Sequence, residues 1–152
     1  MKKIILSLAA AFICSLAMAQ TDLSGSWKLN AEKSKQGEFS FAPKELVLVQ
    51  KDNNLSVESL SSFQGQERKS TEKYTLDGKE CVNAGMMNTE RKSTATWSED
   101  KTTLKIVSKM AFQDQTFTTQ ETYKLNAGTL VVESSMTMQD REMKETRVYD
   151  KK

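Results

Sequence analysis

The stretch Thr102 to Phe112, TTLKIVSKMAF, alternates apolar and polar residues with the two-residue period of a β-strand. Leu104 and Ile106 fall on one face of such a strand, whereas Lys105 and Lys109 fall on the other. Lysine is rarely buried, so we expect the lysine face in solvent and the opposite face in a core. The pattern predicts a half-buried strand of an antiparallel sheet.

A second stretch, Thr129 to Met138, repeats this pattern as TLVVESSMTM. Leu130 and Val132 share a face with Ser134, just as Ser108 shares the apolar face of the first stretch. Both stretches therefore predict an inner face that is apolar, with a small polar residue near the middle of the strand.

Further runs of the same kind, separated by turn residues, make up most of the remaining chain. The other expected strands are Ser24–Asn30, Glu45–Lys51, Leu55–Phe63, Gln66–Leu76, Met87–Trp97, Thr116–Leu125 and Met143–Tyr149, with a short strand around Cys81 and Val82. Asp77-Gly78 is a strong hairpin signal.

About eight to ten strands joined by short turns predict sequential antiparallel pairing. An open sheet of this kind would leave two long edges exposed, and closure removes them. We therefore predict an all-β fold, an up-and-down antiparallel β-barrel of about eight to ten strands. A two-sheet sandwich is the alternative. The longest segment between strands, Ala31 to Ala42, is expected to be a short helix or flap over one barrel end, or a flexible loop.

The N-terminus has the three parts of a bacterial secretory signal peptide. Lys2 and Lys3 supply positive charge, and Ile4 to Leu16 is an apolar run too short to span a bilayer. Ala17-Met18-Ala19 is a small-x-small cleavage site. We expect cleavage after Ala19, one domain over residues 20–152, and a periplasmic or secreted location.

The two cysteines predict neither a disulfide nor a lipid anchor. Cys14 lies in the apolar run and follows Ile13, where lipoprotein signals carry a small residue, so lipidation is the weaker alternative. Cys81 is then the one cysteine of the processed chain, and we expect a half-buried, unreactive thiol.

Charge excludes two classes of partner. Removing the first 19 of the 152 residues takes two lysines from 22 basic residues and leaves 20 against 20 acidic residues. A balanced chain has no net field to attract nucleic acid or an anionic membrane. No second apolar stretch reaches transmembrane length, and we expect a monomer.

The sequence offers little for catalysis. It contains no histidine, the commonest general base and metal ligand, and one cysteine cannot form a zinc cluster. Its few glycines are scattered rather than gathered in a phosphate loop. We therefore predict no enzyme, no catalytic residue, no metal and no cofactor.

Arginines behave differently from lysines in this pattern. Arg68, Arg91 and Arg147 share the parity of apolar residues on their strands, as do three glutamates. Those glutamates are Glu72, Glu121 and Glu145. Arginine tolerates burial when paired, because its planar guanidinium stays charged and donates several hydrogen bonds. Three interpretations follow: a cavity holding a polar ligand group, a structural Arg–Glu network, or a β-bulge that reverses the parity of a strand.

Four segments resemble the calycin superfamily, the lipocalins and fatty-acid-binding proteins. Gly25-Ser26-Trp27-Lys28-Leu29 resembles their Gly-x-Trp first strand. Trp97 with Thr102 to Lys105, and then Leu130 to Glu133, resemble late strands of the fatty-acid-binding group. Thr146 to Lys151 resembles its terminal strand. The resemblance implies a lipocalin-like barrel in which Arg147 and Tyr149 anchor a ligand carboxylate.

The chain also departs from that family. Ile106 stands where a second carboxylate-binding arginine is usual, and an extra hairpin spans Val107 to Gly128. Nothing in Ala31 to Ala42 matches the family's paired helices. Because the chain has an expected signal peptide, exported lipocalin-like domains are the closer analogue in cellular location.

We therefore predict an exported, non-enzymatic protein that holds a small hydrophobic or amphipathic ligand, such as a fatty-acid-like carboxylate, in a barrel cavity. The candidate ligand-binding residues are Arg147, Tyr149, Arg68, Arg91, Tyr74, Trp27, Ile106, Phe112, Phe117 and Met136. A methionine-rich group would supply either core packing or a flexible apolar wall: Met86-Met87, Met136, Met138 and Met143. The alternative function is a structural or protein-interaction barrel with a filled interior and no small ligand.

Overall fold

A computed structural model describes residues 19–37, 40, 42–63, 65–85, 89–112, 115–138 and 141–152, with the side chain of Phe63 left out. Most of the expected signal peptide, including Cys14, lies outside these residues. Met86-Met87 of the methionine-rich group also lies outside them.

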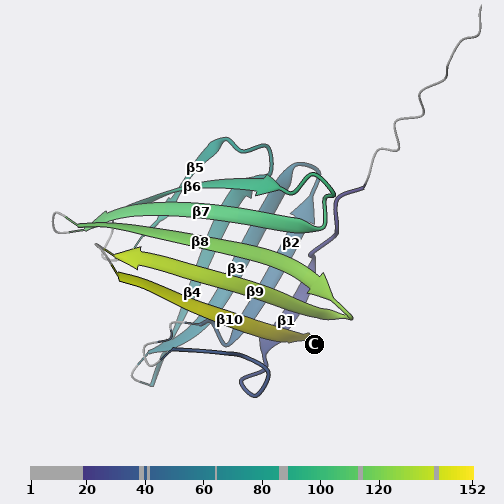
Figure 1. Cartoon of the computed structure of the whole chain (residues 1–152), viewed down its shortest axis with the longest axis horizontal. Helices are drawn as coiled ribbons and strands as arrows, with labels where there is room; N and C mark the ends of the chain where they lie inside the picture. The colour runs from purple at the N-terminus through teal and green to yellow at the C-terminus, as the bar shows by residue number, and fades with distance from the viewer. Residues whose placement is uncertain are drawn as a thin grey trace, which may run out of the picture.

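Ten strands form one antiparallel sheet (Figure 1). They are β1 (Gly25–Leu29), β2 (Glu45–Lys51), β3 (Asn54–Phe63), β4 (Gln66–Thr75), β5 (Glu80–Ala84), β6 (Glu90–Trp97), β7 (Thr103–Phe112), β8 (Gln115–Asn126), β9 (Thr129–Met138) and β10 (Arg141–Lys151). The order across the sheet is β4-β3-β2-β1-β10-β9-β8-β7-β6-β5. Strands that are adjacent in the sheet are therefore consecutive in the sequence, except β1 and β10, whose pairing joins the first strand to the last.

The sheet curls into a nearly closed barrel rather than a sandwich. In Figure 1, strands β7 to β10 cross in front of β2 to β4. The pairing of β1 with β10 joins the two sides, with Leu29 opposite Tyr149. The predicted all-β up-and-down barrel is confirmed.

The two edges of the sheet, β4 and β5, meet through side chains. The Lys73 backbone N–H donates to Asn83 Oδ1 at 2.8 Å, and Asn83 Nδ2 donates to the Lys73 carbonyl at 3.0 Å. The Thr75 backbone N–H also donates to Cys81 Sγ at 3.2 Å. One amide and one thiol thus replace the ladder that would otherwise complete the barrel.

Turn chemistry sets the register of the β8–β9 hairpin. Ala127 and Gly128, which join Asn126 to Thr129, both have positive φ, 46° and 82°. Two successive left-handed residues are typical of the type I′ turn, whose twist matches that of paired strands.

The segment after β1 contains no helix among its described residues. Instead, the Lys35 backbone N–H donates to the Thr146 carbonyl at 2.7 Å, and the Thr146 N–H donates to Lys35 O at 2.9 Å. The chain therefore runs on beside β10 after β1 ends. Of the alternatives for Ala31 to Ala42, the short helix is not found in the part that the structure describes.

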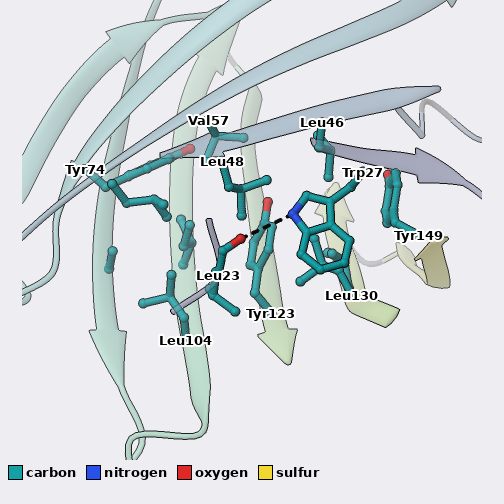
Figure 2. Close-up of a cluster of buried hydrophobic side chains, with 14 of the residues drawn as sticks. Leu23, Trp27, Leu46, Leu48, Val57, Tyr74, Leu104, Tyr123, Leu130 and Tyr149 are labelled. Carbon is teal, nitrogen blue, oxygen red and sulfur yellow. Dashed lines mark hydrogen bonds between the residues drawn. The ribbon is translucent and has the colours of Figure 1, made fainter. Parts of the chain in front are cut away.

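The apolar core fills one end of the barrel, around Trp27 (Figure 2). Trp27 is 2% exposed, and its Nε1 donates to the carbonyl of Leu23 at 3.2 Å. Leu23 is fully buried although it precedes β1, so the N-terminal segment plugs this end. Outside, Lys151 Nζ lies 5.6 Å from the centre of the Trp27 ring, within range of a cation–π contact.

Candidate functional site

The inward faces of the strands change from buried to accessible along the barrel. On β9, Leu130 and Val132 are buried, whereas Met136 and Met138 are half-buried. On β10, Tyr149 is fully buried and Met143 is 40% exposed. The barrel thus has two unlike halves.

We call the end built from the buried core the sealed half. Its residues include Leu23, Trp27, Leu48, Leu104, Ile106, Leu130, Val132 and Tyr149. The open half is the other end, where β7 ends at Phe112 opposite Gln115 of β8 and β9 ends at Met138 opposite Arg141 of β10 (Figure 1). Its inward residues are Met110, Phe112, Phe117, Thr119, Met136, Met138 and Met143, none of them fully buried.

Between the two halves lies a charged belt, defined by Glu72, Arg91, Glu121, Glu145 and Arg147. Arg147 Nη1 donates to Glu121 Oε1 at 3.0 Å, and its Nε donates to Glu145 Oε2 at 2.9 Å. The Arg147 side chain is 13% exposed, so these are largely desolvated ion pairs. One guanidinium is therefore held by two carboxylates.

The other arginine of the belt has one carboxylate partner. Arg91 forms an ion pair with Glu72, whose Oε2 accepts a hydrogen bond from the Tyr74 hydroxyl at 2.9 Å. In the same way the Tyr123 hydroxyl donates to Glu121 at 2.9 Å. Each tyrosine thus donates to a glutamate two residues away on its own strand.

Tyrosine ionisation is suppressed around the belt. Burial raises the pKa of Tyr74, Tyr123 and Tyr149, and the Glu121 carboxylate adds to the effect at each of them. Burial alone would lower the pKa of Arg147, but Glu121, Tyr149 and Glu145 raise it overall.

Three buried polar atoms at the belt have no hydrogen-bond partner among the described residues. They are the hydroxyl oxygen of Tyr149, Nε of Arg91 and Oε1 of Glu72, and the last of these is held in the ion pair with Arg91. Buried polar groups are normally hydrogen-bonded, so such atoms indicate a place for water or a ligand. Figure 2 shows the hydroxyl groups of Tyr123 and Tyr149 pointing toward the same side of the core.

A pair of buried serine hydroxyls adds to the polar groups inside the barrel. Ser93 Oγ and Ser108 Oγ lie 2.9 Å apart, and both residues are buried. These are cross-strand neighbours on β6 and β7. The mid-strand serine at Ser108 therefore has a buried partner.

The sequence-predicted residues separate into three groups. Arg91 and Arg147 lie in the belt, and Tyr74 and Tyr149 adjoin it. Trp27 and Ile106 are packed in the sealed half, whereas Phe112, Phe117 and Met136 line the open half. No measurement of binding tests these assignments, and they stay predictions.

Arg68 is the exception, because the expectation of enclosure is wrong for it. Arg68 keeps the parity of Glu72 on β4 but is exposed. The bonds between β4 and β5 begin at Lys73, so among the described residues Arg68 has a neighbouring strand, β3, on one side only. A short β5 thus leaves this part of β4 open to solvent.

The parity-reversing bulge is not found at the other charged positions. Arg91 pairs with Glu72, and Arg147 pairs with Glu121 and Glu145, inside the barrel. Such pairs are those of the Arg–Glu network, which was one of the three interpretations. Sequence reasoning missed Tyr123 as a belt donor, although its parity with Glu121 was the available signal. It also missed Leu23 and Asn83, whose roles depend on contacts distant in sequence.

The described residues offer no other chemical centre. No group of three or more histidine, cysteine, aspartate or glutamate side chains among them is placed to hold a metal ion. No helix in the described ranges is long and apolar enough to cross a membrane. A surface hollow of about 490 Å³ lies over the β4–β5 gap, where Val49, Lys73 and Val82 form part of its wall.

Comparisons with known proteins bear on the fold. No protein-family model matches the sequence, and no curated protein matches it. Solved structures do match. Zebrafish ileal bile acid-binding protein, complexed with cholic acid, is 14% identical with a TM-score of 0.56, over 85% of this chain and 98% of that one.

Two further structures agree. Fatty-acid-binding protein 1 of Echinococcus granulosus is 14% identical with a TM-score of 0.56, over 85% of this chain and 96% of its own. A secretory abundant heat soluble protein of Ramazzottius varieornatus is 14% identical with a TM-score of 0.58, over 89% and 98%. The chain therefore has the calycin-like β-barrel fold. Its ten-stranded barrel is similar in fold to these structures of a bile-acid-binding and a fatty-acid-binding protein.

Proposed function

We propose that this protein is a non-enzymatic binding protein, which holds one small hydrophobic or amphipathic molecule inside the barrel. The observation that carries the proposal is the unequal interior. A sealed apolar end, a charged belt with unpartnered buried atoms and an accessible apolar end lie in succession.

This order matches the chemistry of an amphipathic ligand. The half-buried Phe117, Met136 and Met138 offer apolar surface, and methionine adapts to varied shapes. The belt supplies the few polar groups that orient a ligand in a mostly apolar site. Two of the similar structures are by name binding proteins, for bile acid and for fatty acid, which supports this class of function over catalysis.

The resemblance to fatty-acid-binding proteins suggests a carboxylate at Arg147 and Tyr149. That assignment stays a prediction. In this chain Arg147 already has two carboxylate partners, so a ligand carboxylate would have to replace one of them or share the guanidinium with both.

The first experiment is native mass spectrometry of the purified protein, with organic extraction of whatever is bound. We expect a small molecule to be bound to the purified protein. If none is bound, we expect members of a lipid panel to displace a fluorescent probe from the barrel. Thr119→Trp, which fills the open half from β8, should reduce binding about tenfold or more. Gln120→Trp, on the exposed outer face of the same strand, is the matched control.

A clean protein mass with no binding from the panel would contradict the proposal. The protein-interaction barrel with no small ligand would then be the better interpretation. Equal binding by the Thr119→Trp and Gln120→Trp variants, both folded by circular dichroism, would place any ligand outside the barrel.

Export is the second part of the proposal. The charge, apolar run and cleavage site at the N-terminus support removal of residues 1–19 and a periplasmic or secreted location. Expression in a bacterium followed by fractionation and N-terminal sequencing tests it. We expect Gln20 as the first residue, and a cytoplasmic protein that keeps Met1 would contradict export.

A further inference from the structure

We infer that the ligand's polar group is an uncharged hydrogen-bond acceptor, the hydroxyl or carbonyl oxygen of a neutral amphiphile, rather than a carboxylate or an amine. The inference rests on the proposed function, since it concerns the polar end of the same interior site. Three observations carry the inference: the charge of the belt, the use of its donors, and the absence of a partner for Arg91 Nε and the Tyr149 hydroxyl among the described residues.

The belt already has an excess of negative charge. Among the described residues, Glu72, Glu121 and Glu145 are paired with two cations, Arg91 and Arg147. With all five ionised, the belt carries a formal charge of −1. A ligand carboxylate would add a second uncompensated negative charge in a partly desolvated place, where like charges repel strongly.

Several of the donors that could hold an anion are already engaged. Arg147 uses both Nε and Nη1 on glutamates. The hydroxyl groups of Tyr74 and Tyr123 donate to Glu72 and Glu121. The carboxylates of the chain itself therefore already take up four donors that a ligand carboxylate could otherwise use.

The unpartnered atoms define the missing group. Arg91 Nε is a donor that cannot accept, so whatever meets it must supply an acceptor oxygen. An ammonium group only donates, so it could not satisfy that N–H, and the buried acceptor of the belt without a hydrogen bond, Glu72 Oε1, is already held in the ion pair with Arg91. The Tyr149 hydroxyl, also without a partner among the described residues, either donates to or accepts from a ligand hydroxyl.

An uncharged oxygen atom of the ligand satisfies all of these requirements of charge and hydrogen bonding. It accepts from Arg91 Nε or the Tyr149 hydroxyl, adds no charge to the belt, and leaves the Arg–Glu pairs intact. The apolar remainder of the ligand then points toward Phe117 and Met136 in the open half. The specific class is an alcohol, ester or amide with an apolar body.

The test compares ligands that share a chain and differ in the polar end. Dodecanol, N-methyldodecanamide, dodecanoate and dodecylamine are titrated at pH 8, where the acid and the amine are both charged. We expect the alcohol and the amide to bind about tenfold or more tightly than either charged ligand. Tyr149→Phe should weaken the alcohol about three- to tenfold, since it removes a hydrogen bond without orphaning another described group.

A variant of the belt sharpens the test. Glu145→Gln brings the formal charge of the belt to zero, and we expect dodecanoate to gain about tenfold while dodecanol changes little. Glu142→Gln makes the same charge change at an exposed position of β10 and serves as the control. Circular dichroism and thermal unfolding show whether each variant is folded.

Each result decides something different. Tighter binding of dodecanoate or dodecylamine than of dodecanol by the unaltered protein would overturn the neutral-group inference and leave the binding function in place. A gain for dodecanoate from Glu142→Gln equal to that from Glu145→Gln would also overturn it. Failure of every ligand to bind would remove the proposed function itself.

Discussion

The sealed half and the open half are built from the same strands but differ in how their inward residues are covered. In the sealed half, Leu23, which precedes β1 and so is not part of the sheet, packs into the interior. The Trp27 indole N–H donates a hydrogen bond to its carbonyl. In the open half no described segment makes an equivalent plug, and Met143 remains 40% exposed. The difference shows that alternation of residues determines which face is inward, whereas additional segments determine whether that interior is filled.

The largest expected effect is a loss of stability at alkaline pH, which tests where the sealed half ends. All three tyrosines of the sequence, Tyr74, Tyr123 and Tyr149, are buried, with the pKa of each raised. Neutral tyrosine is favoured in the folded state, so this stabilisation is intact below about pH 10 and is lost as pH rises toward the folded pKa values. We expect a loss of about 1.4 kcal/mol per tyrosine for each pH unit above about 10.

Ultraviolet absorbance of tyrosinate, recorded with circular dichroism, measures this. The three tyrosines should ionise together with alkaline unfolding. If one titrated reversibly near pH 10 with the fold intact, its hydroxyl would have to be in contact with solvent, and the boundary of the sealed half would be misplaced.

Truncation of the two halves should give unequal losses of stability. Trp27→Ala removes a nearly fully buried ring and should lower the free energy of unfolding by about 3–5 kcal/mol. Met136→Ala removes a half-buried side chain and should lower it by about 1 kcal/mol. Urea unfolding monitored by circular dichroism gives both values, and equal losses would show that the open half is as tightly packed as the sealed half.

The smallest effect concerns the β4–β5 gap. Asn83→Ala removes the two hydrogen bonds to the Lys73 backbone and should lower the free energy of unfolding by about 1 kcal/mol. Amide hydrogen exchange at Lys73 should become faster. Val82→Ala, at the exposed neighbouring position, is the control, and unchanged exchange in the Asn83 variant would mean that the Asn83 side chain does not hold β4 to β5.

Much of the fold was predictable from local pattern. Thr102 to Phe112 and Thr129 to Met138 have the burial alternation expected of them, because the pleat of a strand imposes it. The same alternation, together with the cost of burying an isolated charge, made Arg–Glu pairing one of three interpretations of the inward charges. The exposure of Arg68 was not predictable, because it depends on how far β5 extends beside β4.

The sequence by itself determined the class of fold, the parity of the belt residues and the scarcity of catalytic groups. Each of these depends on residue type and near-neighbour spacing. Only the tertiary structure decided which end of the barrel is sealed, how many carboxylates hold Arg147, and which buried atoms lack partners. Those features arise where strands distant in sequence meet, and their distances depend on barrel closure rather than on any local pattern.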